Sequence, residues 1–168
     1  MDMLRHIRAV VLLPFNVTIV IPSIILYATR SINIGWRLSA PHYLVPTLLG
    51  IFLIGIGLTL MYKTISLFTR MGKGTLAPWD PTQKLVVHGI HRHFRNPKIS
   101  GVFCIILGEA VLVGSVPLLI WFAVFFVVNL VFIPLIEESN LEARFGDEYR
   151  LYKENVPRWV PRLKPWEG

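Results

Sequence analysis

The hydrophobic positions of the chain fall into long uninterrupted runs separated by short, strongly charged segments. The longest run, Ile99–Ile136, has 38 residues and carries one charged residue, Glu109. One membrane-crossing helix needs about 20 apolar residues, so this run is long enough for two. Gly114-Ser-Val-Pro117 lies near its middle and supplies a turn. The pattern predicts a helical hairpin, with helices at about 99–115 and 118–136, whose outer ends meet at one membrane surface.

Two earlier apolar runs predict further spans at about 9–27 and 43–62. The whole chain is rich in apolar residues, with 54% hydrophobic residues and a mean hydropathy of +0.57. We therefore expect an all-α integral membrane protein with about four transmembrane helices, forming a single domain over 1–168. Gly50 and Gly57 are seven positions apart and share nearly one face of the second helix, where small residues let helices pack closely in lipid.

The distribution of lysine and arginine predicts the orientation of these helices. Of 17 such residues, two lie in the loop between the first and second predicted spans, and the other fifteen lie in the N-terminal tail, the loop after the second span and the C-terminal segment. Positive residues accumulate on the cytoplasmic side, so both termini should be cytoplasmic. The net charge of +7 then faces anionic membrane lipids, and topology accounts for it without a nucleic-acid partner.

The segment after the hairpin, Glu137 to Asn155, has an apolar stripe. Its members recur at spacings of 4, 4, 3 and 4, which are helical: Leu141, Phe145, Tyr149, Tyr152 and Val156. The stripe predicts a cytoplasmic amphipathic helix that lies against the membrane surface or the bundle. Three prolines spaced by four residues follow, and we expect them to keep the end of the chain extended.

The polar segments on either side of the hairpin carry two long motifs. The first reads Gly72-x-Gly-Thr-x-x-Pro followed by Leu85-Val-x-x-Gly-x-x-Arg-x-x-Arg-Asn-Pro97. The second reads Glu137-Glu-x-x-Leu-x-x-x-Phe-Gly-x-x-Tyr-x-x-Tyr-x-x-x-Val-Pro157. Together they resemble the signatures of the isoprenylcysteine carboxyl methyltransferase and phospholipid methyltransferase group, over about residues 72–166.

The resemblance implies an integral membrane methyltransferase that uses S-adenosyl-L-methionine and binds it between segments 72–98 and 137–166. It implies that Glu137 holds the amino group of this donor and that Arg95 and the Asn96-Pro97 turn hold its carboxylate. Arg95 and Glu138 are the catalytic residues that we predict. The positions that the resemblance assigns to cofactor binding are Gln83, Lys84, Leu85, Val86, His91, Asn96, Pro97, Lys98, Ile99 and Glu137.

Several positions depart from the pattern of the group. His91 and Ile99 stand where tyrosines are common, and Ile133 stands where the isoprenylcysteine enzymes have a substrate-binding arginine, one helical turn before Glu137. A carboxylate acceptor needs a cation to hold it. The sequence therefore favours a lipid amine or another small lipophilic acceptor from the bilayer over a prenylcysteine carboxylate.

The sequence supports other chemistries less well than methyl transfer. His88, His91 and His93 match no compact zinc spacing, and Cys104 is the single cysteine, so we predict no metal site. Methyl transfer from a sulfonium needs no metal, since the leaving group is already good and alignment does most of the work. A non-catalytic membrane subunit on the same scaffold and a nicotinamide-dependent membrane reductase of related architecture remain as alternatives. The sequence does not determine the oligomeric state.

Overall fold

A computed structural model describes residues 11–32, 35–71 and 85–167 of the chain. All regular elements in these ranges are helical, which confirms the all-α prediction for them. In chain order the elements are η1 (Val11–Val20), α2 (Ile21–Ala28), α3 (Leu44–Met71), η2 (Gly89–Arg92), α4 (Pro97–Val113), α5 (Val116–Phe132), η3 (Ile133–Glu137), α6 (Glu138–Phe145) and α7 (Asp147–Asn155). Among these, η1 and η3 are π-helices and η2 is a 3-10 helix.

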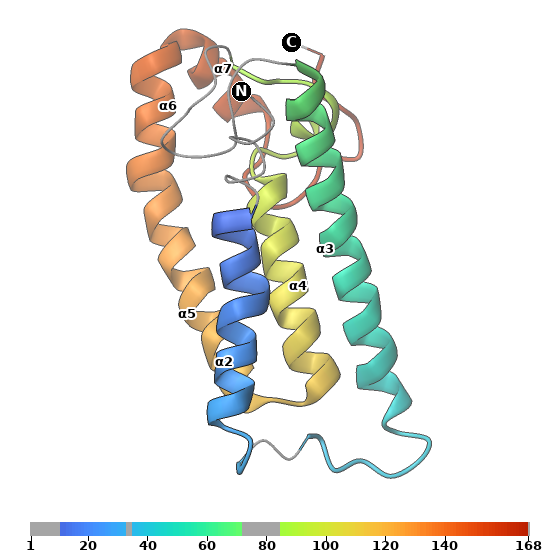
Figure 1. Ribbon diagram of the computed structural model, residues 1–168. Coiled ribbons are helices and arrows are strands. Elements are labelled where there is room, and N and C mark those ends of the chain that lie inside the picture. Colours follow the sequence, from blue (N-terminus) through green and yellow to red (C-terminus); the bar gives the residue numbers. More distant parts are fainter. Residues whose placement is uncertain (1–10, 33–34, 72–84, 168) are drawn as a thin grey trace.

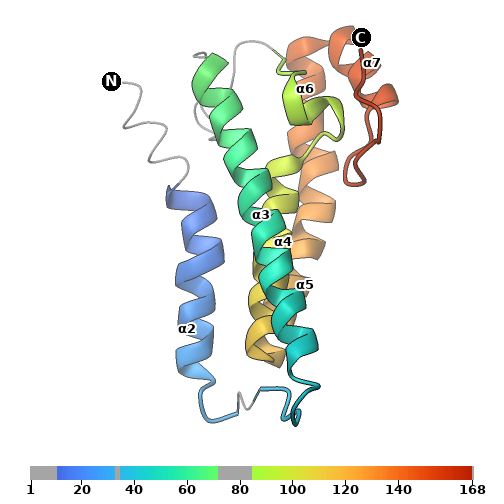
Figure 2. The same ribbon diagram turned by 90° about the vertical axis from the view of Figure 1, so that its right-hand side faces the viewer.

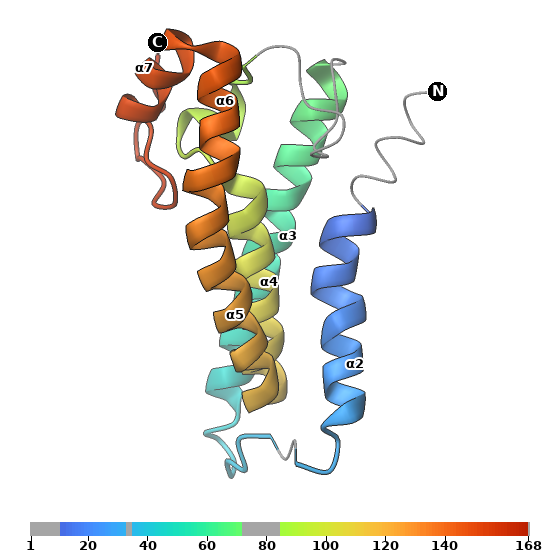
Figure 3. The ribbon, with the colours of Figure 1, turned by 90° about the vertical axis from the view of Figure 1, so that its left-hand side faces the viewer.

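Four helical rods lie side by side along one axis (Figure 1). η1 and α2 form the first rod, and α3, α4 and α5 form the other three. α4 packs against both α3 and α5 (Figures 2 and 3), and α2 contacts α5. The rods correspond to the four predicted helices. α3 continues nine residues beyond the predicted end at 62, because hydropathy reports where apolar sequence stops and not where helical hydrogen bonding stops.

Two stretches within the described ranges, Leu44–Leu67 and Val116–Phe145, are long and apolar enough to cross a membrane. The apolar helix Pro14–Ala28 is shorter. α4 has 17 residues, of which eight are buried, so it is the central helix of the bundle. The number of crossings therefore remains a prediction.

Glycines bring α3 and α4 into backbone contact. A Cβ atom added at Gly57 would lie 2.5 Å from the carbonyl oxygen of Gly101, and one added at Gly50 would lie 2.8 Å from that of Gly108. Such distances leave no room for any side chain at these positions. The predicted packing role of Gly50 and Gly57 is confirmed.

The turn between α4 and α5 forms where the sequence places it. Gly114 ends α4 in the left-handed conformation with φ 69°, which glycine adopts without strain. The Ser115 hydroxyl caps α5 by accepting a hydrogen bond from the Leu118 backbone N–H, at 3.4 Å. Pro117 lies in the first turn of α5, where it needs no N–H partner. The hairpin prediction is confirmed.

The prediction of one amphipathic helix over 137–155 was wrong. α5, η3 and α6 follow one another directly, so the last rod extends to Phe145. Pro134 lies inside η3 and has no N–H to donate, which accounts for the wide π-turn at this point. Gly146, with φ 55°, then reverses the chain before α7 begins. The charged residues after Glu137 mark the end of apolar sequence, not the end of the helix.

The predicted apolar stripe nevertheless forms a small core. Tyr149, Tyr152 and Val156 are buried, and Leu85, Val87 and Trp166 pack against them together with the remaining stripe residues. The C-terminal tail, residues 157–166, is non-helical and hydrogen-bonds to the segment before α4. The Arg95 N–H donates to the Pro157 carbonyl at 2.9 Å, and the Arg162 N–H donates to the His93 carbonyl at 2.9 Å. The amphipathic segment thus covers the segment before α4.

Candidate active site

One cavity of about 690 Å³ lies where the segment before α4 meets η3, α6 and α7. It falls within the range of about 300–1,000 Å³ that is typical of small-molecule sites. Ten of the predicted site residues line it: Leu85, Val86, His91, Arg95, Asn96, Pro97, Lys98, Ile99, Glu137 and Glu138. The other two, Gln83 and Lys84, lie outside the described residues. The hairpin therefore brings the two polar motifs together, as the sequence predicts.

Glu138 is the most heavily paired side chain of the cavity. Its carboxylate accepts two hydrogen bonds from Arg158, from Nε at 2.7 Å and from Nη2 at 2.9 Å. Arg95 Nη1 lies 3.0 Å from Oε1, and Lys153 Nζ lies 3.8 Å from Oε2. The side chain is 2% exposed, so these cations supply the pairing that a buried carboxylate requires. Glu138 therefore fixes Arg95 and joins it to the C-terminal tail.

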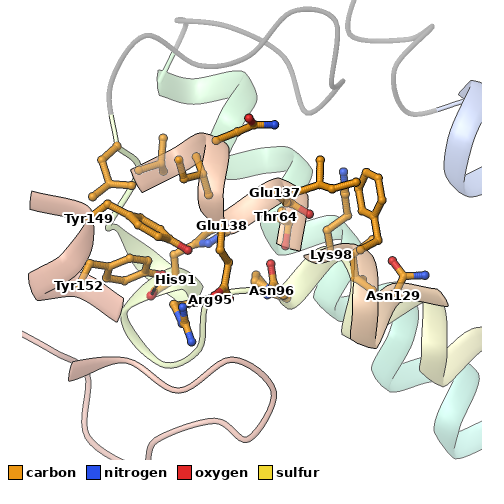
Figure 4. A pocket seen from close by; sticks show the side chains of 18 of the residues that line it. Thr64, His91, Arg95, Asn96, Lys98, Asn129, Glu137, Glu138, Tyr149 and Tyr152 are labelled. Carbon is orange, nitrogen blue, oxygen red and sulfur yellow. Dashed lines mark hydrogen bonds and ion pairs between the residues drawn. The ribbon is translucent and has the colours of Figure 1, made fainter. Parts of the chain in front are cut away.

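Glu137 faces a different partner. Its carboxylate interacts electrostatically with the ammonium of Lys98, from the first turn of α4. Figure 4 shows Glu137 on the Lys98 side of the cavity and Glu138 on the Arg95 side. The adjacent acids thus point to separate partners, as expected for neighbouring positions about 100° apart around a helix.

The wall opposite Lys98 carries three groups that are uncharged at neutral pH. Burial lowers the pKa of His91 to about 4. Burial, and then the charge of Glu138, raises the pKa of Tyr149 to about 12. Burial also raises the pKa of Tyr152, whose hydroxyl donates a hydrogen bond to the His91 carbonyl at 2.7 Å. Neutral rings on this wall suit a flat, uncharged ligand group.

The residues present fit S-adenosylmethionine. Arg95 Nε is buried and donates no hydrogen bond within the part of the chain that the structure describes, so this guanidinium can still bind a carboxylate. Glu137 adds a carboxylate to the lining, and Leu85 and Val86 add apolar surface. The cavity thus combines groups able to bind an anion and a cation with apolar surface.

A comparison with family models matches residues 45–148 to the phospholipid methyltransferase family. The match covers more than half of the chain and includes both sides of the hairpin. The chain belongs to the phospholipid methyltransferase family. Family membership and the two long apolar helices together indicate a membrane protein, and the family implies methyltransferase activity.

An uncharacterized protein of Haemophilus influenzae is 62% identical to this chain over 24 residues. The matched stretch is 14% of this chain and 38% of that protein. Because the stretch is short and the relative uncharacterized, the similarity assigns no activity.

Some residues of the site lie outside the family match. Among the lining residues these are Pro14 and Val17 of η1 and Tyr149 and Tyr152 of α7, and Arg158 of the tail, which holds Glu138, also lies outside it. The sequence analysis missed Arg158, because it counted this residue only as part of the positive charge near the membrane. Its position directly after the Val156-Pro157 end of the second motif was the available signal.

The sequence analysis also missed Thr64 of α3 and Phe125 and Asn129 of α5, which line the cavity inside the bundle. No motif marks them. Asn129 carries the one amide in the apolar stretch of α5, and this was the only available signal.

Proposed function

We propose that the protein is an integral membrane methyltransferase that transfers a methyl group from S-adenosylmethionine to a lipophilic acceptor. In this proposal its four rods cross the membrane and both termini are cytoplasmic. The observation that carries it is the meeting of Arg95 with the acids of the second motif in one cavity, at 3.0 Å between Arg95 and Glu138. Those residues are separated by more than 40 positions and by a whole helical hairpin.

Within this proposal each polar group has one task. Arg95 Nε donates to the carboxylate of the donor, and the Glu137 carboxylate accepts from its ammonium group. Glu138 is placed to hold Arg95 in position through the 3.0 Å ion pair. The neutral wall of His91 and Tyr149 carries no fixed charge that would interact with the sulfonium. When bound, the donor supplies an electrophilic methyl group on sulfur, and the chain aligns it and excludes water.

The nature of residue 133 supports an acceptor without a carboxylate. Ile133 is fully buried in η3, one turn before Glu137, and carries no charge. Ile133 does not line the cavity, so this position supplies no cation for an acceptor carboxylate. We therefore favour a lipid amine or another small lipophilic molecule over a prenylcysteine carboxylate.

A thermal-shift experiment on detergent-solubilised protein tests the proposal. S-adenosylhomocysteine should raise the melting temperature, because a ligand at 100 times its Kd stabilises the folded state by about 2.7 kcal/mol. For Glu137→Ala, the ligand concentration needed for the same shift should be about 10- to 100-fold higher, because one hydrogen bond to a charged group is lost. Glu148→Ala, at an exposed position of α7, is the matched control and should behave as wild type.

Two other outcomes separate the alternatives. A shift with a reduced nicotinamide dinucleotide and none with S-adenosylhomocysteine would support the reductase. No shift with either ligand would support a non-catalytic subunit.

A further inference from the structure

Lys98 brings an ammonium group to the same carboxylate that the proposed function assigns to the ammonium of the donor. It lies in the first turn of α4 and lines the cavity. The charge of Glu137 favours the charged form of Lys98, and Figure 4 shows both side chains on the same side of the cavity. A donor bound to Glu137 would therefore place a second ammonium group beside a lysine that already interacts with this carboxylate.

The described lining of the cavity holds more cationic than anionic side chains before any ligand binds. Arg95, Lys98 and Arg144 are cationic, and Glu137 and Glu138 are anionic. S-adenosylmethionine carries an ammonium, a sulfonium and a carboxylate, so it adds one further positive charge. Because like charges in a confined site disfavour each other, binding is easier if one cation of the protein loses its charge.

The other titratable or charged groups of this lining belong to the segment before α4, η3, α6 and α7. They are His91, Arg95, Glu137, Glu138, Arg144, Tyr149 and Tyr152. The lining residues that η1, α3 and α5 contribute within the described ranges carry no such group. Arginine does not lose its proton in proteins, and the histidine and the tyrosines are already uncharged. Lys98 is therefore the cation of this set that can become neutral.

The surroundings of Lys98 already favour its neutral form. Burial lowers the pKa of this lysine, which stands one position before the predicted span at 99–115, and the charge of Glu137 opposes the change. When Glu137 pairs with the ammonium of the donor, two cations share one carboxylate. An ammonium group that loses its counter-charge away from water tends to give up its proton, because an unpaired buried charge is costly.

We propose that Lys98 is a proton-releasing residue of the donor site, whose ammonium group loses one proton to solvent when the ammonium of the donor pairs with Glu137. The inference rests on the proposed function. One N–H bond of Nζ breaks, its electrons remain on nitrogen as a lone pair, and the proton leaves to water. The cavity then contains an uncharged amine, which is able to accept the proton that an amine or alcohol acceptor gives up on methylation.

Calorimetric titration of the detergent-solubilised protein with S-adenosylhomocysteine tests the proposal. This ligand carries the same ammonium and carboxylate groups as the donor and does not react. Titrations at one neutral pH in phosphate and in Tris, whose protonation enthalpies differ, give the number of protons released per ligand. The wild type should release about one proton more than Lys98→Met, since the contribution of the ligand's own amino group is common to both. Lys63→Met, at an exposed position of α3, is the matched control and should behave as wild type.

Lys98→Arg separates proton release from a structural ion pair. Arginine keeps a positive charge beside Glu137 but does not lose its proton. This variant should fold as wild type does, release no more protons than Lys98→Met and bind S-adenosylhomocysteine more weakly than wild type. It also replaces Lys98→Met if that variant does not fold.

Equal proton release by the wild type and the arginine variant would overturn the proposal and leave Lys98 with a structural role. Binding of S-adenosylhomocysteine without this proton release would contradict the inference and leave the proposed function standing. If wild type shows neither a binding heat nor a thermal shift with the ligand, the proposed function fails and the inference fails with it.

Discussion

At the scale of residues, the two adjacent acids of the second motif have different surroundings. Glu138 is buried among Arg95, Arg158 and Lys153, whereas Glu137 faces Lys98. The motif alone presents them as an equivalent pair. Their separation follows from helix geometry, since neighbouring positions differ by about 100°, and from the tail, which delivers Arg158 to only one of them.

Replacing Glu138 by glutamine should strongly destabilise the protein. The change leaves two guanidinium groups without their shared carboxylate, and breaking a buried ion pair from one side costs about 3–5 kcal/mol. Glu142→Gln is the matched control, because Glu142 pairs with Arg150 and Lys153 at a more exposed position, where solvent screens an ion pair and its loss should cost little. Melting temperatures in detergent measure both effects. Equal losses for the two variants would show that the Glu138 network does not hold the site.

At the scale of elements, α3 and α4 are held together by glycine-to-backbone contacts. Gly50 and Gly57 of α3 lie against Gly108 and Gly101 of α4. This packing fixes the position of the first turn of α4, which carries Lys98 into the cavity. Close helix contact in lipid depends on such small residues, because apolar side chains gain nothing by leaving the hydrocarbon.

Gly57→Ala should therefore destabilise the bundle by about 1–3 kcal/mol, the usual cost of overfilling a packed interface. The added Cβ would lie 2.5 Å from a backbone oxygen, which cannot rotate away. Gly55→Ala is the control on the same helix, since its Cβ would meet nothing within 4 Å. Gly55→Ala should be neutral or slightly stabilising, because alanine has a better helix propensity than glycine. Melting temperatures of the two variants test this prediction, and equal values would contradict it.

At the scale of the whole molecule, the polar segments that line the cavity lie at one end of the bundle, and the loop between α2 and α3 lies at the other (Figure 1). The segment before α4, α6, α7 and the C-terminal tail gather at one end. If the rods cross a membrane, only this end can draw a water-soluble donor from the cytoplasm. The bias of positive residues predicts that this end lies inside the cell.

Cysteine labelling tests this orientation in intact cells. In a Cys104→Ala background, Leu38→Cys should react with a membrane-impermeant maleimide, because Leu38 is exposed in the loop between α2 and α3. Leu163→Cys, which is 99% exposed in the tail, should react only after the cells are permeabilised. Labelling of Leu163→Cys in intact cells would show that the orientation is the opposite of the predicted one.

The helical rods and the meeting of the two polar motifs could be predicted from the residue pattern alone. Apolar runs fix where helices form, and the Gly114 turn requires α5 to return antiparallel to α4, so Arg95 and Glu138 had to arrive at the same end. The sequence also identified the stripe around Tyr149 and Tyr152, because a helical period is a local property. It did not place the end of α6 or the reversal at Gly146.

Which groups share partners depends on the packing of separate segments. Arg158 reaches Glu138 because the tail hydrogen-bonds to the segment before α4, and Asn129 lines the cavity together with residues of η1, α3 and α4. Such contacts depend on how separate rods are rotated and how the tail folds back, and neither follows from the spacing of residues along one segment.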